Sequence, residues 1–267
     1  MRDVAAAGRI LAAPPLAARA LGRAFRATYE YFIFYGLLIV FALSSLAWSL
    51  TAALLHPLLP RALGARVGQF MIMAGFRYFV GFMKLTGIIK CDLTALDALR
   101  NEPSLVIAPN HPSLLDAVLV ISRLPHVVCT AKATLLENPF LGGGARLAGF
   151  IRNDAPTHLV KESVSQLRAG RQLLIFPEGT RTAGDSINAF KGGFALIAKR
   201  ADAAIQTVFI ESNSRFLGKG WFLLRKPAFP LIYRVRLGPS LKVDGDLRNF
   251  VAGLENVYRH ELGSPRS

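Results

Sequence analysis

An uncharged stretch near the N-terminus constrains this 267-residue chain more than any other feature. From Phe32 to Leu55 the sequence contains no Asp, Glu, Lys or Arg. The run is longer than the roughly 20 apolar residues that a helix needs to cross a bilayer. His56-Pro57 and Pro60 end it, because proline interrupts a helix. A buried core helix is the alternative, but the length and the absence of charge predict a membrane-embedded helix.

The residues before this stretch form a basic leader. Residues 1–30 contain five arginines and two acidic residues, and Pro14-Pro15 interrupts any single helix there. The half that follows the two prolines predicts a basic amphipathic helix suited to an anionic lipid surface. An unstructured leader is the alternative.

A second apolar stretch follows the first. Val67–Ile89 contains Arg77 and Lys84, which share one side of a helix, while the large apolar residues gather on the other side. This division predicts a helix that lies in the membrane interface or packs on the first helix. Basic residues flank both sides of the uncharged stretch, so charge alone does not fix its orientation. We predict a helical hairpin over residues 31–89, embedded in one side of the membrane.

The overall charge and composition narrow the class of partner. The formal net charge is +15 and 52% of the residues are hydrophobic. The charge predicts an anionic partner, and the apolar content favours an anionic membrane over nucleic acid. No zinc spacing, Walker A loop or RNA-recognition motif is present, so we expect no nucleic-acid partner. Cys91 and Cys129 are too few for a disulfide framework or a metal site, and they indicate a reducing compartment.

Residues 90–267 alternate between short apolar runs and helical patterns. This alternation predicts one α/β domain, with a mixed, largely parallel sheet layered with helices. Strands are expected at residues 105–108, 127–131, 150–152, 173–176, 204–210 and 231–237. Helices are expected at residues 114–123, 141–148, 157–169, 193–200 and 247–262.

The segment Asn110–Asp116, with the sequence NHPSLLD, lies between an expected strand and an expected helix. Such junctions are where α/β sheets present their chemistry. His111 is the side chain best suited to accept a proton near neutral pH, and Asp116 would orient it and stabilise its charged form. Asn110 or Ser113 would cap the helix. Taken alone, the pattern also fits a capping histidine and a surface aspartate.

The segment Phe176–Arg181, with the sequence FPEGTR, follows another expected strand. Gly179 allows a sharp turn that exposes backbone amides to an anion. Arg181 offers a planar fork for phosphate, and Thr180 adds a hydroxyl donor. Glu178 would hold that guanidinium or accept a hydrogen bond from a substrate hydroxyl. An ordinary turn with a solvated ion pair is the alternative for this segment alone.

Together the two segments resemble the paired motifs of the 1-acylglycerol-3-phosphate acyltransferase family of glycerolipid acyltransferases. The NHxxxxD motif of that family falls on Asn110, His111 and Asp116, and its FPEGTR motif is matched at every position. The resemblance covers roughly Arg77–Leu237, and the hydrophobic N-terminal helices are similar to the membrane-docking element of the family. It implies the glycerolipid acyltransferase fold.

Two further residues are carried over from the resemblance, and two departures accompany them. Lys132 lies in a segment where the family carries a lysine near the substrate phosphate, and Arg152 is the basic residue of the second motif in a displaced register. The segment Ile205–Val208 lacks the proline that is usual in the fourth motif. Both departures fall where the family contacts the acceptor and the acyl chain, so the identity of the acceptor stays open.

The resemblance implies transfer of a fatty acyl group from a thioester, acyl-carrier protein or coenzyme A, to the hydroxyl of a lysolipid. His111 would remove the hydroxyl proton and Asp116 would stabilise the imidazolium. No cofactor or metal is required, and the cytosolic donor places the reaction on the cytoplasmic face of the inner (cell) membrane. The acceptor would be 1-acylglycerol-3-phosphate, in phospholipid biosynthesis. The substrate-binding residues would be Asn110, Lys132, Arg152, Glu178, Gly179, Thr180 and Arg181.

Two alternatives to this function stay open. One is a non-phosphoglyceride acceptor such as lyso-ornithine lipid, and the other is a membrane lipid hydrolase that uses the same His–Asp pair to activate water. Two other segments have weaker signals. The glycines at 142–144 predict a flexible turn, and the aromatic and basic residues between Lys219 and Phe229 predict a membrane-facing loop.

Overall fold

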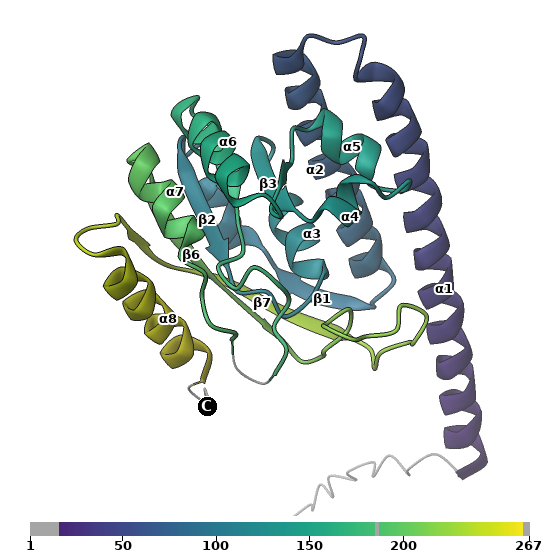
Figure 1. Ribbon diagram of the computed structural model, residues 1–267. Helices are drawn as coiled ribbons and strands as arrows, with labels where there is room; N and C mark the ends of the chain where they lie inside the picture. The colour runs from purple at the N-terminus through teal and green to yellow at the C-terminus, as the bar shows by residue number, and fades with distance from the viewer. Residues whose placement is uncertain (1–15, 185–186, 264–267) are drawn as a thin grey trace, which may run out of the picture.

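The computed structural model describes residues 16–184 and 187–263, and a seven-stranded sheet forms its centre (Figure 1). Every strand pairing is parallel except that between β6 and β7. The predicted mixed, largely parallel α/β sheet is therefore confirmed. In order across the sheet, the strands are β1 (Ile89–Asp92), β7 (Leu231–Leu241), β6 (Ala204–Ser212), β2 (Leu105–Pro109), β5 (Gln172–Leu174), β3 (Val127–Ala131) and β4 (Ile151–Arg152).

Helices cover both faces of the sheet because its central strands are apolar on both sides. On β2, the side chain of Ile107 joins one hydrophobic cluster, while those of Val106 and Ala108 join the other. The first cluster is covered by α1 (Leu16–Leu55), α2 (Arg61–Leu85) and α3 (Leu115–Ile121). The second is covered by α6 (Pro156–Arg168), α7 (Gly193–Ala201) and α8 (Leu247–Gly263).

All the strands and helices predicted for the α/β part are present, with ends displaced by at most four residues. Three short elements were not predicted, because they are shorter than the windows in which a period is visible. They are β1, the 3-10 helix η1 (Thr94–Leu99) and α4 (Ala133–Leu136).

The N-terminal hairpin packs on the same core as the sheet. Helix α1 is continuous over 40 residues, so the second half of the predicted leader belongs to it; residues 1–15 lie outside the described part of the chain. Phe34 and Leu37 of α1 and Met83 of α2 are buried in the first cluster. Helix α2 ends at Leu85, four residues before the predicted end, because Ile89 already begins β1. The hairpin is thus held against the α/β part through its inner face.

The outer face of the hairpin is apolar. Among the described residues, one segment, Ala20–Leu55 of α1, is long and apolar enough to cross a membrane. Seven of its exposed large aliphatic and phenylalanine side chains recur at intervals of four or seven residues, which keeps these seven on one side of the helix. They are Leu21, Phe25, Phe32, Ile39, Leu43, Leu50 and Leu54. On α2, Arg77 and Lys84 are exposed and Ile72 is buried, as the sequence predicts. An apolar surface this long indicates an interaction site.

Helix α5 (Gly142–Leu147) packs closely against α1. The predicted flexible turn at residues 142–144 is wrong, because these glycines form the first turn of α5. A Cβ atom on Gly143 would overlap the carbonyl oxygen of Ser49, and the Gly143 N–H donates to the Ser49 hydroxyl (2.9 Å). Glycine is present here because the two helix backbones meet.

Replacement of Gly143 by alanine is expected to lower the free energy of unfolding by about 1–3 kcal/mol, because the added methyl group forces the α1 and α5 backbones apart. Thermal unfolding in detergent would measure the change. Gly253→Ala is the matched control, because a Cβ atom on Gly253 in α8 meets nothing within 4 Å; it should stabilise the protein by up to about 1 kcal/mol. Equal melting temperatures for the two variants would contradict this account of the contact.

Candidate active site

The structure brings His111 and Asp116 together at the centre of the sheet. Strand β2 ends at Pro109, and α3 begins at Leu115, so His111 lies in the intervening loop and Asp116 in the first turn of the helix. The His111 Nδ1 atom lies 3.1 Å from Asp116 Oδ2. Because Asp116 accepts from Nδ1, the lone pair of the neutral ring is on Nε2.

The His111 imidazole is fixed on several sides. Its ring stacks on Phe176, with centroids 3.7 Å apart and an interplanar angle of 18°. The backbone N–H of His111 donates to Glu178 Oε1 (2.9 Å). The side chain is only 13% exposed, and no described residue binds its Nε2 atom. Nε2 is therefore free to exchange a proton with a molecule in the adjoining cleft.

The Asp116 carboxyl group is fully buried. Its Oδ2 atom also accepts the Ser113 N–H (2.7 Å), whereas Oδ1 has no partner among the described residues. Burial raises the pKa of Asp116 to about 6, and the hydrogen bond from His111 opposes that rise. Near neutral pH the carboxylate is thus ionised, and an imidazolium beside it would be stabilised.

Glu178 joins the two sequence motifs. Its buried carboxylate accepts the N–H groups of His111 (2.9 Å) and Asn188 (2.8 Å), and also the Thr182 hydroxyl (2.9 Å). The expected contact with the Arg181 guanidinium is not formed. The structure thus gives Glu178 a positioning role, in which it holds the loop that carries His111.

Both polar atoms of the Asn110 side chain bind backbone groups. Its Nδ2 donates to the carbonyl of Ile210 (2.8 Å), and its Oδ1 accepts the N–H of the same residue (2.7 Å). These bonds continue the β2–β6 pairing beyond the end of β2. Nearby, the buried hydroxyl of Tyr258 donates to the Ala108 carbonyl and accepts the Val208 N–H (3.2 Å). Asn110 therefore positions His111. Neither Asn110 nor Ser113 is the N-cap residue of α3, which is Leu114, but the Ser113 hydroxyl accepts the N–H of Leu115, the first residue of the helix (3.1 Å).

The turn of the FPEGTR segment requires glycine. Gly179 has a φ of +66°, a conformation that other residues rarely adopt, and its missing side chain leaves room for Lys191. Its N–H donates to the Phe176 carbonyl (2.9 Å), so that amide is not available to an anion. Thr180 and Arg181 follow and line the cleft. Arg181 Nη1 donates to the carbonyls of residues 217 (2.9 Å) and 218 (2.8 Å), which fixes the guanidinium at the wall of the cleft.

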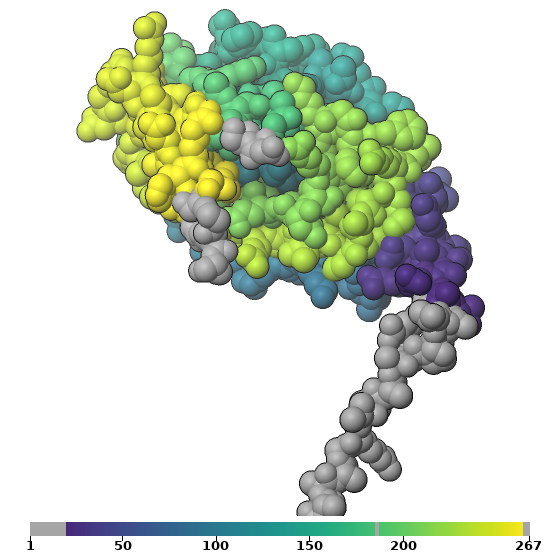
Figure 2. Space-filling model, turned by 90° about the horizontal axis from the view of Figure 1, so that it is seen from below, coloured from purple at the N-terminus to yellow at the C-terminus, as the bar shows by residue number. Residues whose placement is uncertain are grey.

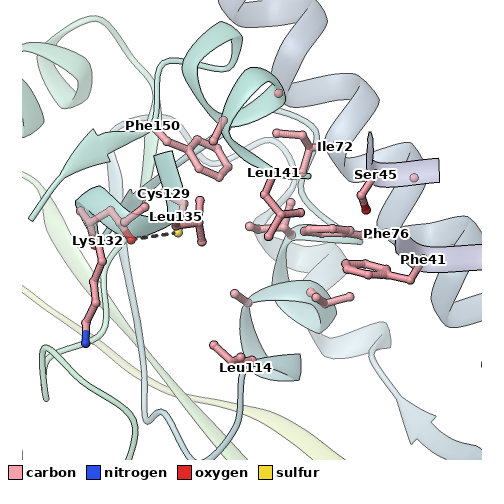
Figure 3. Close-up of a pocket in the computed structure, with 18 of the residues that line it drawn as sticks. Phe41, Ser45, Ile72, Phe76, Leu114, Cys129, Lys132, Leu135, Leu141 and Phe150 are labelled. Carbon is pink, nitrogen blue, oxygen red and sulfur yellow. Dashed lines mark hydrogen bonds between the residues drawn. The ribbon is translucent and has the colours of Figure 1, made fainter. Parts of the chain in front are cut away.

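The cleft beside His111 has a volume of about 640 Å³. Phe176, Thr180, Arg181 and the imidazole line one part of it. Residues of α1, α2 and α3, together with residues between Cys129 and Asn153, form the rest of its walls. Figure 3 shows the aromatic side chains Phe41 and Phe76 on the side formed by the hairpin, with the amino group of Lys132 directed away from them. The cleft is thus polar at one end and apolar at the other.

The cleft reaches the apolar surface of the hairpin. Val40, Met71 and Tyr78 line it and are themselves exposed, Tyr78 by 72%. They belong to the outer parts of α1 and α2. A lipid chain in contact with that surface would therefore be able to enter the cleft between the two helices.

The two remaining predicted residues differ in position. Lys132 is exposed, immediately precedes α4 and lines the cleft. Arg152 is not among the residues that line the cleft; its guanidinium pairs with Asp154 (2.7 Å) and lies 3.9 Å from Glu137. The neighbouring Asn153 lines the cleft instead. The structure thus brings every predicted residue except Arg152 to the loops around His111 or to the cleft.

A protein nucleophile is not evident near His111. Cys129 lines the cleft, but burial raises the pKa of its thiol to about 12, so it is not a thiolate at neutral pH. In the described ranges, His, Cys, Asp and Glu side chains do not form a group of three or more that could hold a metal ion. The group that the structure places beside the cleft for proton exchange is the His111 imidazole.

Comparison with known proteins identifies the family. Residues 90–211, which include both motifs, match the Acyltransferase family. An Acyltransferase-family domain thus occupies this segment of the chain. A solved 1-acyl-sn-glycerophosphate acyltransferase from Thermotoga maritima has the same fold, with a TM-score of 0.67 and 16% identity over 92% of this chain and 99% of that one.

Three relatives share sequence with this chain. The 1-acyl-sn-glycerol-3-phosphate acyltransferase of Helicobacter pylori is 34% identical, over 52% of this chain and 60% of its own length. The enzyme of that name from Pseudomonas aeruginosa is 23% identical, over 83% and 84%. The lyso-ornithine lipid O-acyltransferase of Pseudomonas aeruginosa is 36% identical, over 41% and 43%. The match thus spans less than two thirds of the first and third relatives.

Some residues of the site have roles that the sequence did not predict. Phe176 stacks on the imidazole, and Thr182 and Asn188 complete the shell of Glu178. Phe176 and Thr182 lie in or beside the FPEGTR segment. The expectation that this segment and NHPSLLD form one site could therefore have indicated that both residues lie near His111. Nothing in the sequence around Asn188 indicates its role, because its contact depends on the path of the loop after β5.

Proposed function

We propose that the chain transfers a fatty acyl group from an acyl thioester to the hydroxyl of a lysolipid, with 1-acylglycerol-3-phosphate as the acceptor. The observation that carries this proposal is the free Nε2 atom of His111, placed at the polar end of a cleft whose other end is apolar. The names of the first two relatives support the acceptor, because both are 1-acyl-sn-glycerol-3-phosphate acyltransferases.

In the proposed reaction, His111 Nε2 accepts the proton of the acceptor hydroxyl as its oxygen attacks the thioester carbonyl. A tetrahedral intermediate forms, the carbon–sulfur bond breaks, and the thiolate takes the proton from the imidazolium. The new ester and a free thiol are the products. Asp116 holds the Nδ1 proton throughout and stabilises the imidazolium. A thiolate is a good leaving group, so the reaction needs no covalent acyl-enzyme.

The hairpin supports a location on one leaflet of a membrane. Helix α1 is about 60 Å long, at about 1.5 Å per residue, which is twice the thickness of the hydrocarbon core. It binds the body of the protein at two distant points, through Glu30, which pairs with Lys226 (2.8 Å), and through Ser49 at α5. A helix held in this way lies along the surface, because a crossing would draw the α/β part into the bilayer. A cytosolic acyl-carrier protein or coenzyme A donor places that surface on the cytoplasmic face of the cell membrane.

Lys132 is expected to bind the anionic head group of the acceptor. Replacement by glutamine should raise KM for 1-acylglycerol-3-phosphate about tenfold, because one charge-assisted hydrogen bond is lost. It should leave kcat within about twofold, because Lys132 does not touch the reacting atoms. Lys161→Gln, at an exposed position on α6, is the matched control. An unchanged KM would exclude Lys132 from the phosphate site.

A lyso-ornithine lipid is the second candidate acceptor. The 36% identity to a lyso-ornithine lipid O-acyltransferase favours it, although the match spans 43% of that relative. The two acceptors differ in charge at the head group, since only one carries a phosphate. If lyso-ornithine lipid is the substrate, Lys132→Gln should raise KM by less for it than for a phosphate-bearing acceptor.

The proposal is tested by incubating the detergent-purified protein with labelled acyl-carrier protein or acyl-coenzyme A and a panel of lysolipids. The panel should contain 1-acylglycerol-3-phosphate, lyso-ornithine lipid and a neutral monoacylglycerol. An acylated product that His111→Ala abolishes would support the transferase and name its acceptor. Free fatty acid without acylated lipid, also abolished by His111→Ala, would instead establish the hydrolase.

A further inference from the structure

The segment Ser214–Lys226, here called the 214–226 loop, lies in the connection between β6 and β7 and contacts both sequence motifs. The Ser113 hydroxyl donates to the Phe216 carbonyl (2.7 Å), and the Leu114 N–H donates to the next carbonyl along the loop (3.2 Å). Arg181 of the FPEGTR segment also binds two carbonyls of this loop. One end of the loop is therefore fixed to the residues that hold His111 and Asp116.

The other end of the loop is an exposed apolar tip. Phe222, Leu223 and Leu224 are 67%, 54% and 52% exposed. The tip lies beside α1, where the Tyr35 hydroxyl donates to the Leu224 carbonyl (3.3 Å). Figure 2, which views the molecule from below, shows the yellow-green chain of this region next to the purple N-terminal part of α1. The tip thus continues the apolar surface of the hairpin.

The tip is an ordered turn. Trp221 Nε1 donates to the Arg225 carbonyl (3.0 Å), and the Arg225 guanidinium lies over the Trp221 ring, 5.1 Å from its centroid. The Arg225 N–H donates to the Phe222 carbonyl (2.9 Å). Lys226 then forms a half-buried ion pair with Glu30 of α1 (2.8 Å). These contacts hold three apolar side chains outward at a defined place relative to α1.

The charges around the tip select the partner. Lys219 and Arg225 are exposed on either side of the three apolar residues, and neither forms an ion pair within the described part of the chain. Apolar side chains flanked by cations fit the boundary between the acyl chains and the head groups of an anionic bilayer. A protein partner would not explain why this surface is continuous with that of α1.

We propose that the 214–226 loop is a second membrane-docking element, which inserts Phe222, Leu223 and Leu224 into an anionic bilayer. Through its bonds to Ser113 and Arg181 it holds the catalytic loops at the membrane surface. The inference rests on the membrane location of the proposed function, and it adds a contact that the hairpin does not supply.

Trp221 makes the insertion measurable, because the chain contains two tryptophans and the other is Trp48. The full chain carrying Trp48→Phe would be mixed with vesicles of phosphatidylglycerol and phosphatidylcholine whose acyl chains carry bromine. Trp221 emission should fall at least twofold relative to vesicles without bromine. Unchanged emission from protein that co-sediments with the vesicles would overturn the proposal, because only the hairpin would then be docked.

Two variants test the residues themselves. Phe222→Ser combined with Leu223→Ser and Leu224→Ser should weaken partition into the vesicles at least tenfold and remove the bromine quenching. These side chains are exposed, so the fold should survive, and the melting temperature would verify this. Equal partition of the triple variant and the wild type would also overturn the proposal.

The charge contribution has a matched control. Lys219→Gln with Arg225→Gln should weaken partition into anionic vesicles about 30-fold, since each cation near such a surface contributes about 1 kcal/mol. Lys161→Gln with Arg248→Gln makes the same charge change at exposed sites on α6 and α8 and should alter partition by less than twofold. Equal losses for the two pairs would overturn the assignment of the cations to the docking surface.

These measurements do not depend on turnover, so they separate the two proposals. Quenching of Trp221 in a protein that transfers no acyl group in detergent would sustain the docking loop and reject the proposed function. Acyl transfer in detergent without quenching on vesicles would sustain the proposed function and reject the docking loop.

Discussion

His111→Ala is expected to lower kcat for acyl transfer by about 10²–10⁴-fold, the usual contribution of a general base. His111 lines the cleft, and its imidazole contacts the Asp116 carboxylate. Among the described residues that line the cleft, no other side chain combines a neutral nitrogen base with such a carboxylate, so none is expected to replace His111 as the proton acceptor. KM for the acyl donor should change by less than threefold, because the apolar walls of the cleft are untouched. Single-turnover transfer with a saturating lysolipid would measure the effect.

The His111 variant needs a control for structure, because the ring also stacks on Phe176. A melting temperature within a few degrees of the wild type would show that the loss is chemical. His158→Ala, at an exposed position on α6, should leave both kcat and stability unchanged. Residual turnover above a tenth of the wild-type rate would mean that another group accepts the proton.

The sequence was sufficient to predict six of the seven strands and the contact between His111 and Asp116, for a local reason. NHPSLLD and FPEGTR each lie directly after an apolar strand, and parallel neighbouring strands end at the same edge of a sheet. β2 and β5 are such neighbours. The pairing of His111 with Asp116 also depends only on a five-residue separation across a helix start.

The roles of Asn110 and Glu178 could not be predicted in the same way. Each side chain binds backbone groups that lie far away in the sequence: Asn110 binds Ile210, and Glu178 binds His111. Such contacts depend on which strands are neighbours and on how the loops pack, and a single sequence does not contain that information. The same reason applies to Arg181, which is held by carbonyls of the 214–226 loop.

Arg152 illustrates a different limit. Its register in the motif suggested a substrate contact, but alternation along β4 turns neighbouring side chains to opposite faces. Arg152 pairs with Asp154, while the adjacent Asn153 lines the cleft. A shift of one residue along the chain therefore decides whether a side chain lines the cleft or forms an ion pair at the surface. The amino-acid composition does not reveal which of the two occurs.

Asp116→Asn should separate activity from stability. An amide cannot stabilise the imidazolium and can hold the ring in the wrong tautomer, so kcat is expected to fall by about 10³–10⁴-fold, as in other His–carboxylate pairs. The amide matches the carboxylate in size and can still accept the Ser113 N–H, so the fold should be kept. Steady-state transfer at pH 7.5 would measure the loss. Turnover within tenfold of the wild type would show that the charge of Asp116 is not needed.

The same variant is expected to be more stable than the wild type at neutral pH. Burial raises the pKa of Asp116 from 3.8 to about 6, so the folded protein binds this proton more tightly than the unfolded chain does. The stability from that proton is complete below pH 3.8 and is lost as the pH rises through 6, a loss of up to about 3 kcal/mol. Asparagine does not titrate. The melting temperature of Asp116→Asn relative to the wild type should therefore increase between pH 4 and pH 7.5.

The wild-type enzyme should show the opposite trend in activity. As the pH falls below about 6, Asp116 takes up its proton and the carboxylate that stabilises the imidazolium is lost, so kcat/KM should decline. Protonation of Asp116 thus raises the stability of the protein and removes the charge that would stabilise the His111 imidazolium, over the same range of pH. A difference in melting temperature that did not vary with pH would contradict the raised pKa. In the proposed mechanism, the buried carboxylate is a group that lowers the stability of the fold but serves proton transfer at His111.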